Sequence, residues 1–379
     1  MKDHSLEVHG CHTYDATGAI SPSICLSATF RHPRFGESTG YDYGRVANPT
    51  RESLEKTVAL LERGGRSWAL SSGMAAVQLV FSLLSAGDHV LMSEDLYGGT
   101  VRLAEEVFAD YGITFEYVDV RDLALVGKRM RPETKLVFIE TPSNPMMQIS
   151  DIAALSALAH ENGALLAVDN TFLSPHFQKP LTLGADIVLH SGTKYLCGHN
   201  DVIAGFLVLK DATSAQAKRI ELLAKSAGPN LSALDSWLML RSIKTLGVRV
   251  ERQAENALAI ARWLGTLPEV TEVLYPGLAD HPGYALQQKQ ASGAGGMISF
   301  KVRSAEIAKA ALGRLHLIAF AESLGGVETL LTYPIAQTHA EMPAALLKRT
   351  GLDDKLLRLS VGIEDVEDLK ADLQQALQG

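Results

Sequence analysis

The stretch His190-Ser191-Gly192-Thr193-Lys194-Tyr195 follows a short apolar run, Ala185 to Leu189, that is typical of a buried strand. A strand here would place Lys194 at the end of a sheet, just after the hydroxyl residues Ser191 and Thr193. Lysine is a useful nucleophile only when its amine can lose its proton, and partial desolvation promotes that loss. Ser191 and Thr193 can donate hydrogen bonds to an anion such as phosphate. The stretch therefore indicates a reactive lysine beside an anion site, although most lysines are only surface charges.

An acidic residue ends a second apolar run, 25 residues before Lys194. The run Leu165 to Val168 ends at Asp169 and continues into Asn170 and Thr171. An acid at the carboxyl end of one strand and a lysine at that of another fit a site for pyridoxal 5'-phosphate (PLP). The lysine binds the aldehyde of the cofactor, and the carboxylate keeps the ring nitrogen protonated so that the ring can accept electrons. Lys194 and Asp169 are therefore predicted to share one cofactor pocket.

Composition limits the class of protein. The chain has 379 residues, which is long for one compact core, so two domains are expected. Hydrophobic residues make up 46% and charged residues 21%, as in a soluble globular protein. The net charge of -8 argues against nucleic acid or an anionic membrane as a partner. No apolar run reaches the roughly 18 residues that a membrane span needs.

The cysteines and the first residues bear on location and metal binding. Cys11, Cys25 and Cys197 form no C-x-x-C pair, and residues 1–5 lack the apolar core of a signal peptide. Free thiols in a reducing cytoplasm are therefore expected. Zinc binding by Cys11 and His12 is conceivable, but no second ligand pair follows. The sequence predicts a cytoplasmic protein without a metal site.

Helical and strand-like patterns alternate along the first two thirds of the chain. This alternation predicts a mainly parallel sheet with helices on both faces. The turn Ser71 to Ala76 joins a strand to a helix, and such a junction presents free backbone N–H groups and the positive helix end to an anion. The expected strands are 68–70, 89–92, 115–118, 135–140, 164–169, 187–190 and 205–209, and the expected helices are 53–62, the segment after residue 76, 101–111 and 152–161.

The last third predicts a second, smaller domain. One long helical segment, about 234–264, is expected to lead into it. The first 40 residues are loop-rich and are expected to form an arm that packs on a neighbouring subunit. The predicted division is an arm at 1–40, a large PLP-binding domain at 41–238 and a small domain at 239–379. Within the small domain we expect strands at 270–275 and 297–302 and helices at 305–312, 344–349 and 366–378.

A dinucleotide-binding sheet is the main alternative for such an alternation. That fold needs G-x-G-x-x-G between a strand and a helix, with an acid about twenty residues further on. The nearest candidate, Gly293 to Gly296, precedes a strand instead of a helix. The pattern therefore disfavours a dehydrogenase.

The segment S-G-T-K-Y-L-C-G-H-N-D-V-I-A-G, residues 191–205, resembles the lysine signature of the Cys/Met-metabolism PLP-dependent enzymes. This family comprises cystathionine synthases and lyases, methionine γ-lyases and acylhomoserine sulfhydrylases. The resemblance runs from about Tyr14 to the C-terminus. It implies the fold type I of PLP-dependent transferases, which is aspartate aminotransferase-like, with a mainly parallel seven-stranded sheet and a smaller α/β C-terminal domain.

The resemblance assigns cofactor contacts to particular positions. The turn Ser72-Gly73-Met74 would bind the phosphate together with Ser191 and Thr193. In D-L-Y-G-G-T, residues 95–100, Tyr97 would lie over the pyridine ring. In Y-D-Y-G-R-V-A-N-P-T, residues 41–50, a tyrosine and an arginine would reach across a dimer to the neighbour's phosphate. The residues that inherit these roles are Gly73, Met74, Tyr97, Ser191 and Thr193 in one subunit, and Tyr43 and Arg45 from the other.

The resemblance also assigns contacts to an amino-acid substrate. Arg358 lies within an apolar run, and its planar fork fits the α-carboxylate; an internal salt bridge is the alternative. Asn144 would lie near the cofactor and that carboxylate, and the Ser323 hydroxyl would tether Lys194. Glu322 would receive a distal ammonium group, and Arg102 a distal carboxylate.

The motifs resemble most closely bacterial cystathionine γ-synthases that also act as acylhomoserine sulfhydrylases. The predicted reaction is γ-replacement, in which O-acylhomoserine and cysteine give cystathionine, with Lys194, Tyr97 and Ser323 taking part in catalysis. The alternatives are a cystathionine γ- or β-lyase, an O-acetylhomoserine sulfhydrylase and, outside catalysis, an inactive PLP-fold binding protein. The family also implies a homotetramer built as a dimer of dimers, acting on small amino acids.

Overall fold

The computed structural model describes residues 1–11 and 17–378. Seven strands form one sheet in the order β1-β7-β6-β5-β4-β2-β3. Only β7 runs antiparallel to its neighbours, so the expectation of a mainly parallel sheet is confirmed. The strands are β1 (Arg66–Leu70), β2 (His89–Ser93), β3 (Thr114–Val118), β4 (Thr134–Glu140), β5 (Leu165–Asp169), β6 (Ile187–Ser191) and β7 (Gly205–Leu209).

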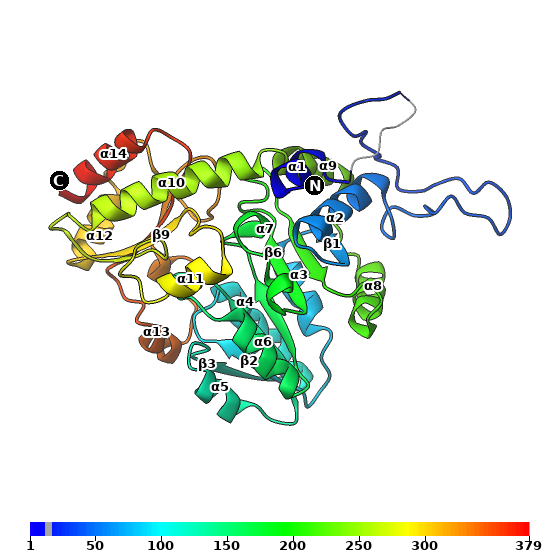
Figure 1. Ribbon diagram of the computed structural model, residues 1–379, viewed down its shortest axis with the longest axis horizontal. Coiled ribbons are helices and arrows are strands. Elements are labelled where there is room, and N and C mark those ends of the chain that lie inside the picture. The colour runs from blue at the N-terminus through cyan, green and yellow to red at the C-terminus, as the bar shows by residue number, and fades with distance from the viewer. Residues whose placement is uncertain (12–16, 379) are drawn as a thin grey trace.

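Helices cover both faces of this sheet (Figure 1). One hydrophobic core lies between the sheet and a first group of helices, and a second core lies between the other face and a second group. The first group is α2 (Pro49–Leu61), α6 (Ile152–Glu161), α7 (Ser174–Phe177) and α9 (Ala233–Ile243). The second is α3 (Gly73–Phe81), α4 (Gly98–Leu103), α8 (Ala215–Ala227) and α13 (Ala344–Thr350), while α5 (Leu123–Arg129) lies beside α6.

Polar side chains begin many of these helices. A side-chain oxygen just before the first turn accepts a hydrogen bond from a backbone N–H that has no partner within the helix. This device explains why short apolar segments of this sequence start as helices where they do. The capping residues are Asn48, Ser72, Asp122, Asp151, Ser214, Ser232 and Ser304.

The last third of the chain forms a second sheet with its own hydrophobic core, as Figure 1 shows on the side of the C-terminus. Its strand order is β10-β11-β12-β9-β8. The strands are β8 (Val270–Leu274), β9 (Met297–Val302), β10 (Ala319–Phe320), β11 (Leu330–Thr332) and β12 (Leu356–Ser360). The helices of this part are α10 (Leu246–Leu264), α11 (Tyr284–Gln290), α12 (Ala305–Leu312) and α14 (Val366–Gln378).

Three expectations for individual elements were wrong. The segment 234–264 is not one helix, because the Ser242 carbonyl accepts from the Thr245 N–H and hydroxyl and from the Arg249 guanidinium, and the chain turns between α9 and α10. The helix expected at 101–111 continues from α4 as a π-helix (Ala104–Phe108) and a 3-10 turn (Ala109–Tyr111). The loop-rich start contains a helix, α1 (Asp3–His9), packed on α2 and α10.

No helix in the described ranges has the length and apolar character that crossing a membrane requires. Residues 17–45 extend away from the body of the chain (Figure 1). Large apolar side chains are exposed along this segment, Phe35 and Leu26 among them.

Candidate active site

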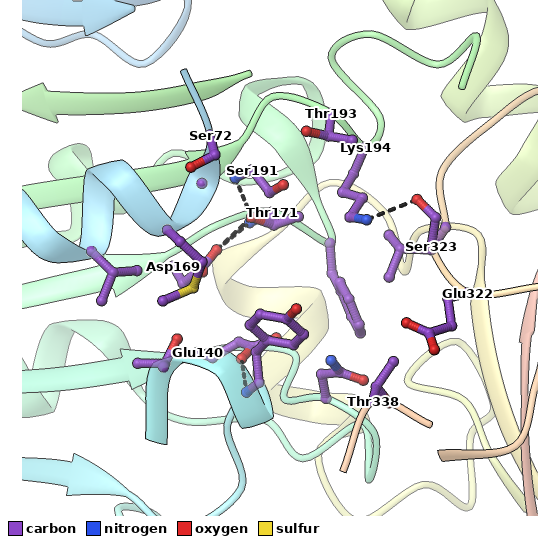
Figure 2. A pocket seen from close by; sticks show the side chains of 18 of the residues that line it. Ser72, Glu140, Asp169, Thr171, Ser191, Thr193, Lys194, Glu322, Ser323 and Thr338 are labelled. Carbon is purple, nitrogen blue, oxygen red and sulfur yellow. Dashed lines mark hydrogen bonds between the residues drawn. The ribbon is translucent and has the colours of Figure 1, made fainter. Parts of the chain in front are cut away.

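A pocket of about 280 Å³ lies at the carboxyl edge of the large sheet. Glu140, Asp169 and Ser191 end three neighbouring parallel strands, β4, β5 and β6, so their side chains meet at this edge. Segments from the second sheet close the other side of the pocket. Figure 2 shows Lys194, Asp169, Glu322 and Ser323 around this single cavity.

Lys194 enters the pocket from the turn that follows β6. Its Nζ donates a hydrogen bond to Ser323 Oγ at 2.7 Å (Figure 2). Burial, assisted by the positive charge of Arg358, lowers the pKa of Lys194 to about 8. Ser323 has a φ of 85°, a strained conformation for a residue other than glycine. The chain thus holds a hydroxyl against an amine that loses its proton more easily than an ordinary lysine.

Asp169 lies on the far side of the same pocket, at the end of β5. Its Oδ1 accepts from the Thr171 N–H at 3.0 Å and from the Thr171 hydroxyl at 2.5 Å. The same hydroxyl accepts from the Ser191 N–H at 2.8 Å and so joins the ends of β5 and β6. Burial raises the pKa of Asp169, so a positively charged partner would stabilise the ionised form of this carboxyl group.

Glu140 is a second buried acid at this edge, paired in register with Asp169 across β4 and β5. Burial and the nearby Asp169 carboxylate raise the pKa of Glu140 well above its ordinary value. Its Oε2 accepts from the Tyr97 backbone N–H at 2.9 Å. The raised pKa favours the protonated form of Glu140 beside the Asp169 carboxyl.

An anion cradle lies where α3 begins. Ser72 caps the helix, and Gly73 and Met74 form its first turn beside Ser191. A Cβ atom on Gly73 would lie 2.9 Å from the Cβ of Ser191, so only glycine permits this close approach. Thr193 lines the pocket too, with its hydroxyl bonded to the main chain of Ala204. The positive end of α3 therefore faces the pocket, as a phosphate site requires.

Arg358 is fully buried on β12 and reaches the pocket from the second sheet. Its Nη1 donates to Asn144 Oδ1 at 2.8 Å, and its Nη2 donates to the Ser323 carbonyl at 3.1 Å. Its Nε–H is buried without a partner among the described residues. A buried guanidinium that has an unused donor and, among the residues with described positions, no paired carboxylate fits an incoming carboxylate.

Tyr97 and Glu322 line the pocket from opposite sides. The Tyr97 ring lies so close to Gly99 that a Cβ atom there would come within 2.5 Å of the ring. The Glu322 carboxylate points into the cavity beside Ser323 (Figure 2). The structure therefore places eleven predicted residues at one pocket: Gly73, Met74, Tyr97, Asn144, Asp169, Ser191, Thr193, Lys194, Glu322, Ser323 and Arg358.

Three predicted residues do not line the pocket. Arg102 is half exposed and pairs with Glu341 outside it. Tyr43 is exposed on the extended segment, where Arg45 donates to the Lys225 carbonyl and lies 5.6 Å from the Tyr43 ring. Roles for Tyr43 and Arg45 in a neighbouring subunit's site stay a prediction, as does the role of Arg102. His12, the conceivable zinc ligand, lies outside the described residues.

Sequence reasoning missed a buried cluster beneath the pocket. Glu62 accepts from Asn170 Nδ2 at 2.9 Å, and its Oε1 lies 2.5 Å from His190 Nε2. Glu62 thereby joins the residues that flank Asp169 and Ser191. A buried polar residue next to the end of an apolar strand could have pointed to His190, but its partner Glu62 lies 128 residues away in the sequence.

A second missed group belongs to the loop after β11. Thr338 lines the pocket, and His339 Nε2 lies 3.1 Å from the Asn144 carbonyl. Burial and the neighbouring Arg358 lower the pKa of His339 to about 4, so it is neutral. No pattern in this loop marked either residue.

The comparisons with known proteins agree with this geometry. The model of the Cys/Met metabolism PLP-dependent enzyme family matches residues 4–378. The chain belongs to this family. It is 47% identical over 379 residues to a cystathionine gamma-lyase of Bacillus subtilis (strain 168), covering 100% of both chains. It is 46% identical over 363 residues to a cystathionine gamma-synthase/O-acetylhomoserine (thiol)-lyase of the same strain, covering 96% of this chain and 92% of the other.

A solved structure gives the same result for the fold. Cystathionine gamma synthase from Xanthomonas oryzae pv. oryzae, in complex with aminoacrylate and cysteine, is 41% identical with a TM-score of 0.96. The alignment covers 100% of this chain and 98% of that one. The predictions of fold type I and of PLP as the cofactor are confirmed.

The pocket of this Cys/Met-metabolism enzyme suits PLP in three respects. The start of α3 offers a phosphate cradle, Lys194 offers an amine of lowered pKa, and Asp169 offers a carboxylate for the ring nitrogen. When bound, PLP supplies an electron sink that makes the substrate Cα–H acidic. The chain's own residues must bind the substrate, orient it and move its protons.

Proposed function

We propose that this PLP-dependent enzyme catalyses γ-replacement, in which O-acylhomoserine and cysteine give cystathionine and the free acid. The observation that carries the proposal is the position of Glu322. Its carboxylate faces the cavity that Lys194 and Arg358 also face, so one site offers a catalytic amine, a carboxylate clamp and an anchor for a second ammonium group. Such a site fits a product with an amino-acid group at both ends.

Each step of this reaction has a candidate residue. Arg358 and Asn144 bind the α-carboxylate and fix the Cα–H bond toward Lys194. Lys194 Nζ removes the Cα proton, and Ser323 Oγ holds the amine in place between transfers. A Cβ proton leaves next, and the Cγ–O bond breaks to release the acyl group as a carboxylate. The cysteine thiol loses its proton as its sulfur bonds to Cγ, and protons return to Cβ and Cα. Tyr97 lines the same space and shares the proton transfers. General acid-base help of this kind typically contributes about 10²–10⁴-fold.

A cystathionine lyase is the second candidate. The matched relatives include a gamma-lyase and beta-lyases at similar identity to the gamma-synthases. The same residues serve both reactions, because each needs a bound α-carboxylate and loss of the Cα proton.

Product analysis separates the two candidates. The holoenzyme is incubated with O-acylhomoserine plus cysteine, and separately with cystathionine alone. We expect cystathionine to form in the first incubation with the larger kcat/KM. Ammonia and a 2-oxo acid formed from cystathionine with a larger kcat/KM would contradict γ-replacement and establish the lyase. The same assay, run with O-acetyl- and O-succinylhomoserine, identifies the leaving group.

Replacing Glu322 by glutamine is expected to weaken the second amino-acid substrate. The change removes the charge that pairs with the distal ammonium and leaves Lys194 and Arg358 in place. Because Glu322 is exposed to solvent, we expect about a two- to tenfold rise in KM for cysteine, with little change in kcat. Steady-state kinetics with a thiol that lacks the ammonium group provides the comparison, and this thiol should show no change. Glu328→Gln, on the same loop but bonded to Asn200, is the control variant.

We further propose that the protein acts as a cytoplasmic homotetramer, a dimer of dimers with a site shared across each dimer. The extended segment with exposed Phe35 and Leu26 supports burial against another subunit. Tyr43 and Arg45 lie on this segment and would then reach the neighbour's cofactor phosphate. The three free cysteines agree with a reducing compartment. Within the predicted arm at 1–40, the extended segment would contact the neighbouring subunit, whereas α1 packs on α2 and α10 of its own chain. The predicted domains at 41–238 and 239–379 would form the body of each subunit.

A further inference from the structure

Two histidines and two glutamates meet on the outside of the molecule, away from the PLP pocket. They come from three helices that lie side by side, α1, α7 and α10 (Figure 1). His4 and Glu7 belong to α1, His176 to α7 and Glu251 to α10. One ligand-type atom from each of His4, Glu7 and His176 lies within 4.8 Å of the other two.

The distances within the cluster separate a hydrogen bond between His176 and Glu7 from two longer contacts with Glu251. His176 Nδ1 lies 2.7 Å from Glu7 Oε1, a hydrogen-bond distance. Because a carboxylate oxygen accepts, Nδ1 donates to Glu7, and this leaves Nε2 as the ring nitrogen that can bind a metal ion. That Nε2 faces Glu251 Oε1 at 3.4 Å, and His4 Nε2 faces the same oxygen at 3.3 Å.

Each of these two distances to Glu251 is close to the distance between two ligand atoms of a zinc site. A tetrahedral Zn²⁺ with bonds of 2.0–2.1 Å to nitrogen and oxygen holds its ligand atoms about 3.4 Å apart. Two neutral imidazoles and one carboxylate are a common set of protein ligands for this ion, and they leave one position for water. We propose that His4, His176 and Glu251 bind a divalent zinc ion at the surface of the molecule.

Glu7 completes the site without touching the metal. A histidine that binds a metal generally donates its other ring N–H to a carboxylate, which fixes the orientation of the ring. Glu7 does this for His176, and its Oε2 lies 3.7 Å from His4 Nδ1. Glu7 is itself held by the Gly247 N–H at 3.1 Å and is only 3% exposed. A buried, fixed carboxylate therefore orients the ring of His176 and lies beside that of His4.

The exposure of the ligands allows the ion to enter. His4 and Glu251 are 61% and 46% exposed, whereas His176 is 8% exposed. The ion would fasten α1 to α7 and α10, and α1 lies before the extended segment in the chain. Zinc would therefore hold the N-terminal helix in place and act as a structural site, independent of PLP chemistry.

Zinc binding to the chelator-treated holoenzyme tests this inference. Equilibrium dialysis with metal analysis should give one tightly bound zinc per chain in the wild type. His4→Ala, His176→Ala and Glu251→Gln should each lower zinc affinity at least about tenfold, and Glu7→Gln should lower it by about 10–100-fold. His160→Ala is the control, because His160 forms a comparable surface pair with Asp186 on other elements. This variant should bind zinc as the wild type does.

Thermal unfolding provides a second measurement that does not depend on activity. Zinc should raise the Tm of the wild type and of His160→Ala and leave the Tm of His4→Ala unchanged. Because His4 is exposed, this variant should fold as the wild type does, and its Tm without zinc verifies that. Absence of bound zinc at micromolar metal, or wild-type binding by His4→Ala and His176→Ala, would overturn the inference. Zinc binding that is lost only when the cysteines are replaced would overturn the inference as well.

Discussion

Replacing Lys194 by alanine is expected to lower kcat by about 10²–10⁴-fold or more, because no other amine lines the pocket in the described part of the chain. Lys194 is the base for the Cα proton in the proposed reaction. Its lowered pKa, about 8, makes the neutral form available near physiological pH. The measurement is single-turnover formation of cystathionine at saturating substrate and added PLP. Residual activity above about a hundredth of the wild type would argue strongly against this role.

Two further variants show whether the loss comes from chemistry or from folding. Lys194→Arg keeps a positive charge and much of the volume, but an arginine does not lose its proton in a protein. It should be as inactive as Lys194→Ala. Lys210→Ala, at an exposed lysine after β7, should keep wild-type activity. Activity in Lys194→Arg would contradict a proton-transfer role for this side chain.

Replacing Arg358 by lysine is expected to produce the second largest loss. A bidentate guanidinium–carboxylate contact contributes two charge-assisted hydrogen bonds, each about 1.5–3 kcal/mol. Losing both corresponds to a fall of about 10²–10⁴-fold in kcat/KM. Lysine keeps the charge but not the planar fork, and it cannot maintain the contacts to Asn144 and the Ser323 carbonyl together.

A substrate without its α-carboxylate distinguishes this clamp from a purely structural arginine. The wild type and Arg358→Lys are compared on O-acylhomoserine and on its α-carboxamide. A clamp predicts that the two enzymes differ strongly on the first compound and little on the second. Equal losses on both compounds would show that Arg358 only supports the fold. Arg349→Lys, at a half-exposed arginine that pairs with Glu94 outside the pocket, is the matched control.

The strands and the residues at their ends were predictable from the sequence because each depends on local pattern. Apolar runs that stop at Asp169 or His190 mark buried strands, and parallel strands bring their carboxyl ends to one edge. The family resemblance supplied residues that local pattern could not, such as Arg358 and Asn144, which lie 214 residues apart in sequence. The fold and most of the pocket could therefore be predicted from the sequence.

What the sequence did not reveal depends on long-range contacts. The pKa of Glu140 is raised because β4 buries this residue beside Asp169, and Glu62 comes into contact with His190 and Asn170 only in the folded chain. The break between α9 and α10 contains neither proline nor glycine, the usual signals. Arg102 finds Glu341 on a loop 239 positions away and so points out of the pocket.

Reduction of the holoenzyme with borohydride, followed by digestion and mass spectrometry, tests most directly whether Lys194 and Asp169 hold the cofactor together. The account predicts that the pyridoxyl group is found on the peptide that contains Lys194, in stoichiometric amount. It also predicts that Asp169→Asn binds PLP more weakly and that its turnover falls sharply, with the label still on Lys194. A label on another lysine, or unchanged PLP affinity and turnover in Asp169→Asn, would contradict the account.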